Sequence, residues 1–501
     1  MRIWATAAAA IMLAGCATAG GPPTATAIAV PQAADPYFQA GALRAQQGPS
    51  SARARNVILF IGDGMGVSTV TAARIFAGQR LGRDGESYDL TLDAFPHTAL
   101  SRTYSHDLQI SESASTATAI VSGVKTRGGG VGLQSAARLN ECGDTAGNIS
   151  MSLFEMAEAQ GLATGIVSTA RITHATPASA YAHVVNRDWE NDATVARANG
   201  APCADIARQL IEWPAGDGFE IALGGGRANF LPRTTTDPET PTVSGQRADG
   251  RDLTAEWAAR PGRVFVWNTA QLEAAPADAD VLGLFAPSHM AYEVERAADV
   301  AGEPSLEQMT TIAIARLSQN PNGYVLMVEA GRIDHAHHEG KAHKALADAV
   351  AFDDAIRAAL AQTSREDTLI LVTADHSHTL TIAGYAQRGT PILGLSTSPD
   401  GDGLALAGDG RPYTTLGYAN GPGSVYADGQ GGAEGRADLR SVDTTAPDYR
   451  QQALVPLGSE THGGEDVAIY AWGPGDENVA GTLEQNVIFH ILARALGIAP
   501  Q

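Results

Sequence analysis

Positive charge is scarce in this sequence. Its 501 residues include 34 lysines and arginines against 55 aspartates and glutamates, which gives a formal net charge of −21 at pH 7. No basic stripe is present that could neutralise a phosphate backbone, so nucleic-acid binding is excluded as the main function. Small phosphorylated molecules are not excluded, because a few buried cations can reverse the local field.

Long apolar runs are missing after the N-terminus, so nothing there is expected to span a bilayer. The N-terminus itself is typical of an export signal, with a positive start at Met1 and Arg2 and the short apolar core "IWATAAAAIML". The core leads into "LAGC", which is typical of a bacterial lipobox, where Cys16 is lipidated and becomes the first residue after cleavage.

An ordinary secretory signal cleaved after "ATA", residues 17–19, is the alternative. Either signal predicts export. We therefore expect a periplasmic protein, held to the membrane by lipid on Cys16 where the lipobox is used.

Cysteine is scarce too, with three in the chain. If Cys16 carries lipid, Cys142 and Cys203 remain, and two cysteines in an oxidising compartment favour one disulfide bond. Two buried free thiols are the alternative.

Few segments alternate apolar and polar residues. Most of the predicted strands are instead continuous apolar runs. Such runs stand in "NVILFIGDGMG", "LATGIVST", "GYVLMVEAG", "DTLILVTADHSH" and "DVAIYAWGP". Continuous runs are typical of parallel strands buried on both faces. Helical segments lie between them, such as "AHKALADAVAFDDAIRAALAQ", whose Leu346, Val350, Ile356 and Leu360 fall largely on one face. The alternation predicts a three-layer α/β/α sandwich with a mostly parallel central sheet.

Composition divides the chain into three parts. We expect residues 1–16 to be a lipoprotein-type signal peptide, and residues 17–50, rich in Ala, Pro, Gly and Thr, to be a tether with a short helix at 36–46. Residues 51–501 should form the main folded domain. Within it, residues 388–454 are rich in Gly, Asp and Pro with weak periodicity, which predicts a surface insertion. There is no internal repeat.

Candidate metal ligands gather at the ends of the predicted strands. Asp63 follows "VILFIG", Glu329 follows "YVLMV", and Asp375 follows "TLILVTA". Seven of the 13 histidines lie in "DHAHHEGKAH", "DHSH" and "THGG". A lone aspartate after a strand is usually a turn residue or a helix cap. Together, however, His with Asp suits Zn²⁺, and Asp, Glu and hydroxyl oxygen suit Mg²⁺, so the conjunction predicts a metal site at one sheet edge.

Nine stretches between residues 56 and 474 resemble, in order, the motifs of the alkaline phosphatase family. They are "GDGMG", "ESASTATA", "STARITHATPASAYAHVVNRDW", "LGGGR", "VEAGRIDHAHHEGKAH", "AFDDAI", "VTADHSH", "YRQQALVPL" and "ETHGGEDVAIYAWGP". The pattern is similar to the animal-type branch more than to the enteric bacterial form. The resemblance implies a hydrolase of small phosphate monoesters with a broad substrate range, an alkaline pH optimum and a phosphoserine intermediate.

The resemblance implies two Zn²⁺ ions and one Mg²⁺ ion. The implied ligands are Asp334, His338 and His462 for one zinc; Asp63, Asp375 and His376 for the other; and Asp63, Thr176 and Glu329 for magnesium. The spacing agrees with these roles. Asp334 and His338 are four residues apart and so share one face of a helical turn. Asp375 and His376 are adjacent, so both can reach one ion only from irregular backbone beyond the strand.

Position by position, the nucleophile implied by the resemblance is Ser113. The residues after it, "ASTATAIV", favour a helix up to Gly123, and a hydroxyl at a helix start lies near free N–H groups that attract a phosphate. We expect Ser111 and Ser115 to be structural. Glu112 stands where the family usually has aspartate, which orients an arginine that grips phosphate; here that arginine is Arg187. A guanidinium suits this role because it binds bidentately and stays charged.

The resemblance implies roles for further residues. Histidine at both His174 and His335 is the animal-type pattern, and we expect both to tune the magnesium site through hydrogen bonds and not to bind metal directly. Cys142 and Cys203 match a disulfide pair of that branch. A calcium site of that branch needs a glutamate after Phe285, where this chain has Ala286, so we leave calcium out. Residues 388–454 match a crown-like insertion that packs between subunits, which implies a homodimer; an acylated monomer is the alternative.

Two other functions compete with this hypothesis. A related phosphodiesterase or sulfatase would use similar metal chemistry, but no Cys/Ser-x-Pro-x-Arg setting surrounds Ser113, and diesterases commonly use threonine and lack the third metal set. An exported protein that only binds phosphate or metal is the second rival, and it would need no intact nucleophile.

Overall fold

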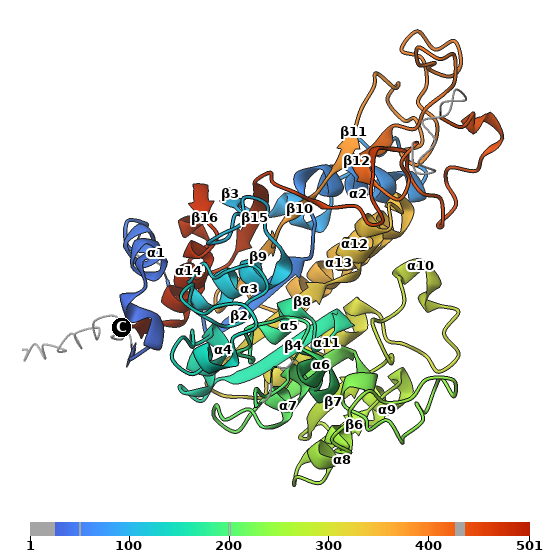
Figure 1. Cartoon of the computed structure of the whole chain (residues 1–501). Coiled ribbons are helices and arrows are strands. Elements are labelled where there is room, and N and C mark those ends of the chain that lie inside the picture. Colours follow the sequence, from blue (N-terminus) through green and yellow to red (C-terminus); the bar gives the residue numbers. More distant parts are fainter. Residues whose placement is uncertain (1–25, 50–51, 199, 201, 426–435) are drawn as a thin grey trace, which may run out of the picture.

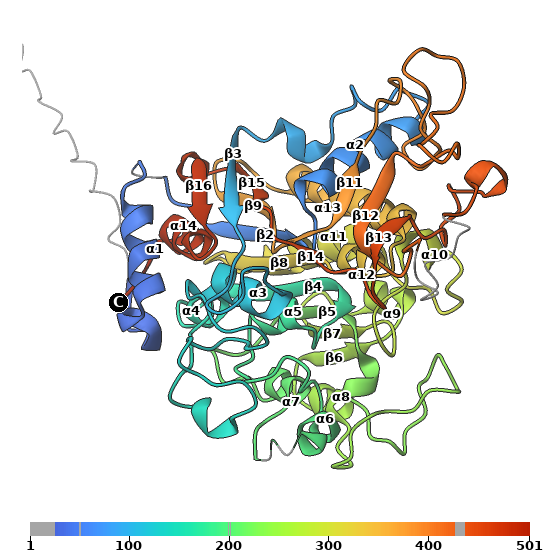
Figure 2. The same cartoon turned by 45° about the horizontal axis from the view of Figure 1, so that its top comes forward.

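A computed structural model describes residues 26–49, 52–198, 200, 202–425 and 436–501. Within these residues, ten strands form one large sheet in the order β16-β3-β15-β9-β2-β8-β4-β5-β7-β6, which runs from top to bottom in Figure 2. In that order the strands span Gly481–Glu484, His97–Arg102, Val467–Trp472, Thr368–Ala374, Asn56–Gly62, Tyr324–Ala330, Ala163–Arg171, Ile221–Gly225, Asp280–Leu284 and Arg263–Val266.

The five apolar runs of the sequence form the five adjacent strands β15, β9, β2, β8 and β4. Four of them are parallel, as expected, but β15 is antiparallel to both of its neighbours. The reversal matters for the site, because it brings the beginning of β15 to the edge where β9, β2, β8 and β4 end. His462, which precedes β15, therefore reaches the same edge as Asp63 and Asp375.

Helices cover both faces of this sheet, which confirms the α/β class. They are α1 (Pro36–Gln46), α2 (Val67–Arg80), α3 (Ser113–Ser122), α4 (Leu153–Glu158), α5 (Ala175–Ala178), α6 (Asp192–Arg197), α7 (Ile206–Ile211), α8 (Leu253–Ala258), α9 (Thr269–Ala274), α10 (Glu293–Arg296), α11 (Leu306–Leu317), α12 (Arg332–His338), α13 (Ala342–Gln362) and α14 (Val487–Leu496).

Two apolar cores lie on opposite faces of the sheet. Along β2, Val57, Leu59 and Ile61 join one core with α3 and α14, while Ile58 and Phe60 join the other with α2, α11 and α13. Successive side chains of a strand point to opposite faces, so a strand covered on both sides must be apolar throughout. This is the physical reason for the continuous apolar runs.

The chain termini of the described part lie together. β1 (Thr26–Ile28) pairs in parallel with β17 (Ile498–Pro500), and α1 packs on α14 beside them (Figure 1). The helix expected at 36–46 is thus present. Cys16 and the rest of the expected signal peptide lie outside the described residues. Among those that are described, no helix has the length and apolar character needed to cross a membrane.

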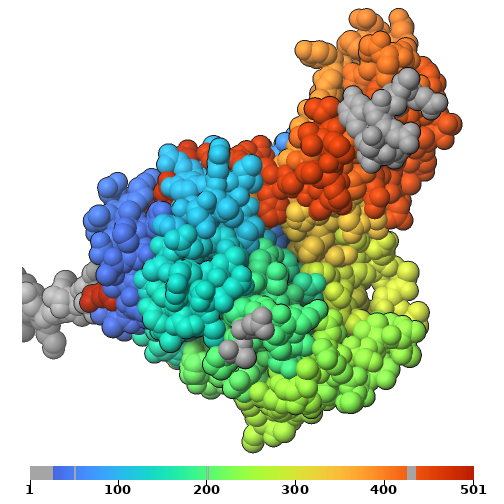
Figure 3. Space-filling view, in the orientation of Figure 1, coloured from blue at the N-terminus to red at the C-terminus, as the bar shows by residue number. Residues whose placement is uncertain are grey.

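Most of the expected insertion, residues 388–454, forms the orange lobe that projects from the body in Figures 1 and 3. Its base is a small sheet of β11 (Leu380–Ile382), β12 (Leu416–Gly421) and β13 (Ala453–Pro456). Exposed apolar side chains there include Tyr385 and Leu454. Residues 426–435 lie outside the described part.

Cys142 and Cys203 form the expected disulfide bond, with their Cα atoms 5.6 Å apart. The bond joins segments 61 residues apart in sequence, beside the core that contains α4 and α7. The alternative of two free thiols is thereby excluded.

An acidic cluster unrelated to the expected site lies at the opposite, amino-terminal ends of β4 and β5. Carboxylate oxygens of Glu158, Asp217 and Glu220 lie within 4.8 Å of one another. Burial, with the neighbouring carboxylates, raises the pKa of Glu158 to about 8 and that of Glu220 to about 7. Hydrogen bonds from Thr164 Oγ1 and Thr164 N to these two side chains offset the shift only in part.

This cluster predicts a loss of stability at alkaline pH. Because the folded-state pKa of Glu158 is raised from 4.5 to about 8, the stabilisation is complete below pH 4.5 and is lost as the pH rises through 8. Between pH 6 and pH 9 the free energy of unfolding of the native protein should therefore fall by roughly 1–3 kcal/mol more than that of Glu158→Gln, whose amide does not ionise. Urea denaturation at both pH values measures this. The exposed Glu141→Gln is the control, and equal pH profiles for Glu158→Gln and the native protein would refute the prediction.

Candidate active site

The expected site residues meet at one edge of the main sheet, where the carboxyl ends of the central strands lie. Asp63 follows β2, Glu329 is the penultimate residue of β8, and Asp375 follows β9. His376 occupies irregular backbone between β9 and the two-residue strand β10 (Ser377–His378), as its adjacency to Asp375 requires. β10 pairs with β14 (His462–Gly463), which sets His378 opposite His462.

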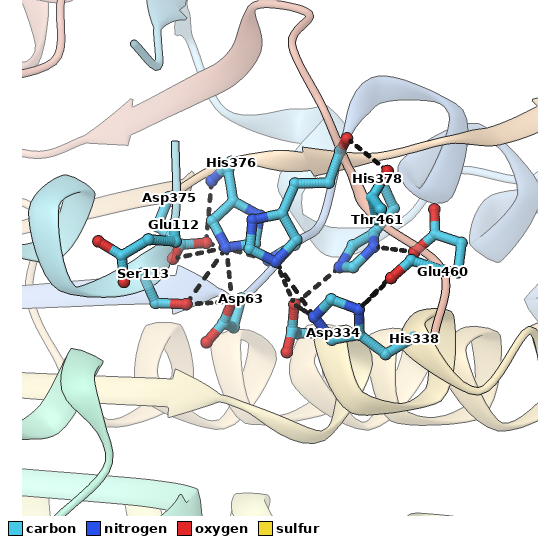
Figure 4. Close-up of polar contacts among 12 residues, drawn as sticks. Asp63, Glu112, Ser113, Asp334, His338, Asp375, His376, His378, Glu460 and Thr461 are labelled. Atoms are coloured by element: carbon cyan, nitrogen blue, oxygen red, sulfur yellow. Dashed lines mark hydrogen bonds and ion pairs between the residues drawn. The ribbon is translucent and has the colours of Figure 1, made fainter. Parts of the chain in front are cut away.

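Ser113 is the first residue of α3 and is buried. Its Oγ lies 3.4 Å from Asp63 Oδ1 and 3.2 Å from His376 Nε2 (Figure 4). The helix ends at Gly123, whose φ of 78° is the left-handed conformation that closes many helices. Ser111 Oγ and Ser115 Oγ instead hydrogen-bond each other at 2.7 Å. Of these three serine hydroxyls, that of Ser113 lies beside Asp63 and His376.

Glu112 is both the N-cap of α3 and the partner of Arg187. Its carboxylate accepts hydrogen bonds from the backbone N–H groups of Ala114, Ser115 and Gly129 at 2.9–3.0 Å, and from Arg187 Nη1 at 2.5 Å. Burial alone would raise the pKa of Glu112, but Arg187 and the three amides outweigh it and lower the pKa to about 2. Glu112 therefore stays ionised and ties the arginine to the helix that carries Ser113.

The first metal group contains Asp334, His338, His378 and His462, whose ligand atoms lie within 4.8 Å of one another. Asp334 and His338 share one face of α12, with His338 Nε2 3.3 Å from Asp334 Oδ1. His462 Nε2 lies 3.1 Å from His338 Nε2 and 3.4 Å from Asp334 Oδ1. The three residues expected to hold one zinc are thus together, and His378 joins them.

The second metal group contains Asp63, Asp375 and His376. His376 Nε2 lies 3.4 Å from Asp63 Oδ1 and 3.4 Å from Asp375 Oδ2. Asp375 Oδ1 accepts hydrogen bonds from Gly64 N and His376 N at 3.0 and 2.9 Å, which orients the carboxylate. Asp334 also lies within 4.8 Å of Asp63 and His376, so the first two groups adjoin.

The third metal group contains Asp63, Glu329 and Thr176. Thr176 Oγ1 lies 3.4 Å from Asp63 Oδ2, and Ser168 Oγ hydrogen-bonds Glu329 Oε2. Glu329 Oε1 is buried and has no hydrogen-bond partner among the described residues. A nitrogen of His174 lies within 4.8 Å of Asp63 and Glu329, so this ring reaches closer to the group than the sequence hypothesis assumed.

Imidazole rings form the outer wall of the third group. His174 Nε2 lies 2.9 Å from Arg187 Nη2, so this ring contacts the expected phosphate clamp. The ring of His335 lies 5.4 Å from that of His174 and 3.9 Å from that of His289, centroid to centroid. The sequence did not single out His289, because nothing in its local pattern distinguishes it from a loop residue.

Buried negative charge dominates the edge. Asp63, Glu329, Asp334 and Asp375 are each at most 4% exposed. Burial, with the charges of the neighbouring carboxylates, raises the pKa of Asp63 well above its usual range, and burial raises that of Glu329 to about 7. Carboxylates at this depth require cations to balance them. The Asp–His sets fit Zn²⁺ and the Asp–Glu–Thr set fits Mg²⁺, and the unpartnered Glu329 Oε1 supports the latter.

Sequence reasoning missed His378 and Glu460. His378 Nε2 lies 2.8 Å from Asp334 Oδ1, and its Nδ1 lies 2.5 Å from Glu460 Oε2 (Figure 4). Burial alone would lower the pKa of His378, but hydrogen bonds to the two carboxylates raise it to about 9. A signal was available, since both residues belong to the motifs "DHSH" and "ETHGGED".

Comparison with known proteins decides the family. A family model described as alkaline phosphatase matches residues 54–498. The tissue-nonspecific alkaline phosphatase isozyme of Gallus gallus is 45% identical over 457 residues, covering 89% of this chain and 85% of the relative. An alkaline phosphatase of Gadus morhua is 45% identical over 452 residues, covering 88% of this chain and 92% of the relative.

The chain belongs to the alkaline phosphatase family. The structure of Thermus thermophilus alkaline phosphatase is similar, with a TM-score of 0.65 at 27% identity, covering 93% of this chain and 96% of that one. That of the Antarctic bacterium TAB5 has a TM-score of 0.59 at 23% identity, covering 90% and 99%, and supports the fold. Membership confirms the recognition made from the motifs. It also favours an enzyme over the non-catalytic binding protein that the sequence left open.

Proposed function

We propose that this member of the alkaline phosphatase family hydrolyses phosphate monoesters through a phosphoserine on Ser113. The observation that carries the proposal is the position of Ser113 Oγ at the start of α3, within 3.4 Å of both Asp63 and His376. Arg187, held by Glu112, supplies a cation for the phosphate beside it. The residues that would hold metal are Asp334, His338 and His462 for one zinc; Asp63, Asp375 and His376 for the other; and Asp63, Thr176 and Glu329 for magnesium.

Two displacements follow from this arrangement. In the first, Ser113 Oγ loses its proton to solvent and forms a bond to phosphorus while the bond from phosphorus to the leaving oxygen breaks, and the leaving alkoxide takes a proton from water and departs as an alcohol. In the second, water attacks the phosphoserine, releasing phosphate and restoring the hydroxyl. The bound metals would lower the pKa of the serine hydroxyl and of the attacking water and neutralise charge on the phosphoryl oxygens. Arg187, whose guanidinium contacts Glu112 and His174, would orient the phosphate, and the positive end of the α3 dipole would favour its negative charge.

The decisive experiment compares a monoester with a diester after loading the protein with zinc and magnesium. A phosphate monoesterase should turn over the monoester at least about a hundredfold faster, because a diester lacks one of the free oxygens that Arg187 and the metals would bind. Faster diester turnover would assign the related phosphodiesterase function instead. No turnover of either would leave only phosphate or metal binding.

The extra methylene of Glu112 gives a prediction specific to this chain. An aspartate there is one methylene shorter and cannot meet the three backbone amides and Arg187 in their present positions, so Glu112→Asp should shift Arg187. The KM for a monoester and the inhibition constant for phosphate should each change by at least about threefold, with activity retained.

Steady-state kinetics with phosphate as product inhibitor measure both constants. Glu155→Asp, which shortens the capping glutamate of α4 outside the site, is the matched control and should leave them unchanged. Unchanged constants in Glu112→Asp would show that the tether length is irrelevant.

Substrate range, assembly and location complete the proposal. The residues described recognise phosphate and not a leaving group, which favours a broad range of small monoesters at alkaline pH. Exposed Leu454 in the insertion and exposed Tyr385 just before it support a homodimer through that lobe, with an acylated monomer as the alternative. The "LAGC" sequence supports export to the periplasm with lipid on Cys16. Sedimentation of the purified protein and mass spectrometry of its N-terminal peptide test these two points.

A further inference from the structure

Glu460 is a buried carboxylate, 1% exposed, in the segment between β13 and β14. We propose that Glu460 is a positioning residue that sets the zinc affinity of the first metal group by holding two of the three expected zinc ligands, Asp334 and His338. The inference rests on the proposed function, because it assumes that this group binds zinc.

The contact with Asp334 runs through His378. Glu460 Oε2 lies 2.5 Å from His378 Nδ1, and His378 Nε2 lies 2.8 Å from Asp334 Oδ1. The ring is thus held at both nitrogens and cannot rotate without losing a hydrogen bond. Asp334 Oδ1, the oxygen that His338 Nε2 and His462 Nε2 also face, is thereby fixed in direction.

The contact with His338 runs through the backbone of Glu460. His338 Nδ1 lies 2.6 Å from Glu460 O and donates to it, while Glu460 N donates to His338 O at 2.9 Å. A ring whose Nδ1 carries the proton presents Nε2 as a metal ligand, and such outer hydrogen bonds orient metal-binding imidazoles. His338 Nε2 is the atom that faces His462 and Asp334.

The surroundings lock Glu460 in this position. Thr379 N and Thr379 Oγ1 donate to Oε1 at 2.7 and 2.6 Å. Gly421 lies so close that a side chain there would meet Glu460 Cβ at 2.9 Å. None of the hydrogen bonds that Glu460 makes within the described residues goes to the second metal group. The effect should therefore be selective for the first group.

The test measures zinc retention by the zinc-loaded protein equilibrated against graded concentrations of a chelator. In Glu460→Gln one of the two zinc ions should be lost at about 10–100-fold higher free zinc than in the native protein, with the other unchanged within about threefold. Added zinc should restore turnover. Glu465→Gln is the matched control, because its carboxylate bonds Ser377 Oγ and no ligand of the first group, and it should retain both ions like the native protein.

A double-variant comparison assigns the affected ion. In a His462→Ala background, where the first group has already lost a ligand, Glu460→Gln should not weaken the remaining zinc further. Should Glu460→Gln fail to fold, Thr379→Val, which removes one donor to Oε1, should weaken the same ion by about 2–10-fold.

Three outcomes would overturn the inference: unchanged retention of both ions in Glu460→Gln, equal weakening of both, or unchanged retention in Thr379→Val where Glu460→Gln is unfolded. Equal weakening would mean that Glu460 stabilises the fold in general. If the native protein itself bound fewer than two zinc ions, the proposed function would fail. Native-like zinc retention by the variants is a different result, and it would refute only the role of Glu460.

Discussion

Ser113→Ala is expected to lower turnover of a phosphate monoester by roughly a thousandfold or more, because it removes the hydroxyl that lies beside both Asp63 and His376. It should also prevent trapping of a labelled phosphoenzyme when substrate is quenched in acid. Zinc content should be unchanged, since the carboxylates and imidazoles of the three metal groups remain. Turnover, acid-stable label and metal content are each measured on the same preparations.

Ser115→Ala is the control for this prediction. It removes the hydroxyl that bonds Ser111 and Glu112 but leaves the Ser113 Oγ contacts to Asp63 and His376. Turnover should stay within about tenfold of native, because the effect is indirect. A phosphoryl label on any residue other than Ser113 would contradict the assignment of the nucleophile.

Stripping the metals with a chelator is expected to abolish turnover and to lower the thermal midpoint by on the order of 10 °C. Without cations, the carboxylates of Asp63, Glu329 and Asp375 face one another in a buried site. Their pKa values are raised, by burial and mutual charge, so the metal-free fold is most stable when they are protonated.

The pH dependence has a definite sign. Protonation of Glu329 stabilises the metal-free fold. This stabilisation is complete below pH 4.5 and is lost as the pH rises through about 7. The difference in midpoint between metal-loaded and metal-free protein should therefore widen from pH 5 to pH 8. Calorimetry measures it, and Ser113→Ala should show the same thermal change with no turnover to lose. Equal midpoints at pH 8 would mean that the site needs no cations.

Much of the fold could be predicted from local patterns. The five continuous apolar runs became five adjacent strands because a strand covered on both faces has no polar side. The helix from 342 to 362 was visible in its apolar spacing. The direction of β15 was not, because an apolar run reads alike for a parallel and an antiparallel neighbour.

The candidate site divides in the same way. Ser113, Glu112 and Arg187 could be named from motifs, and so could Asp334 and His338, whose spacing of four residues agrees with a shared helix face. The sequence could not reveal that Glu112 also caps α3, nor that His378 and Glu460 support Asp334. These contacts join residues 44 and 82 positions apart, and chain folding alone decides which buried polar groups meet.

Residue types and their order therefore identified the family, the strands and the candidate ligands. The tertiary structure decided how those ligands are held. A metal ligand can be recognised from its chemistry and its motif, whereas the groups that orient it are ordinary carboxylates and imidazoles. The antiparallel β15 and the pairing of β10 with β14 bring the segment around Glu460 and His462 to the carboxyl ends of β2 and β9. Only then do the groups that orient the ligands come within hydrogen-bond distance of them.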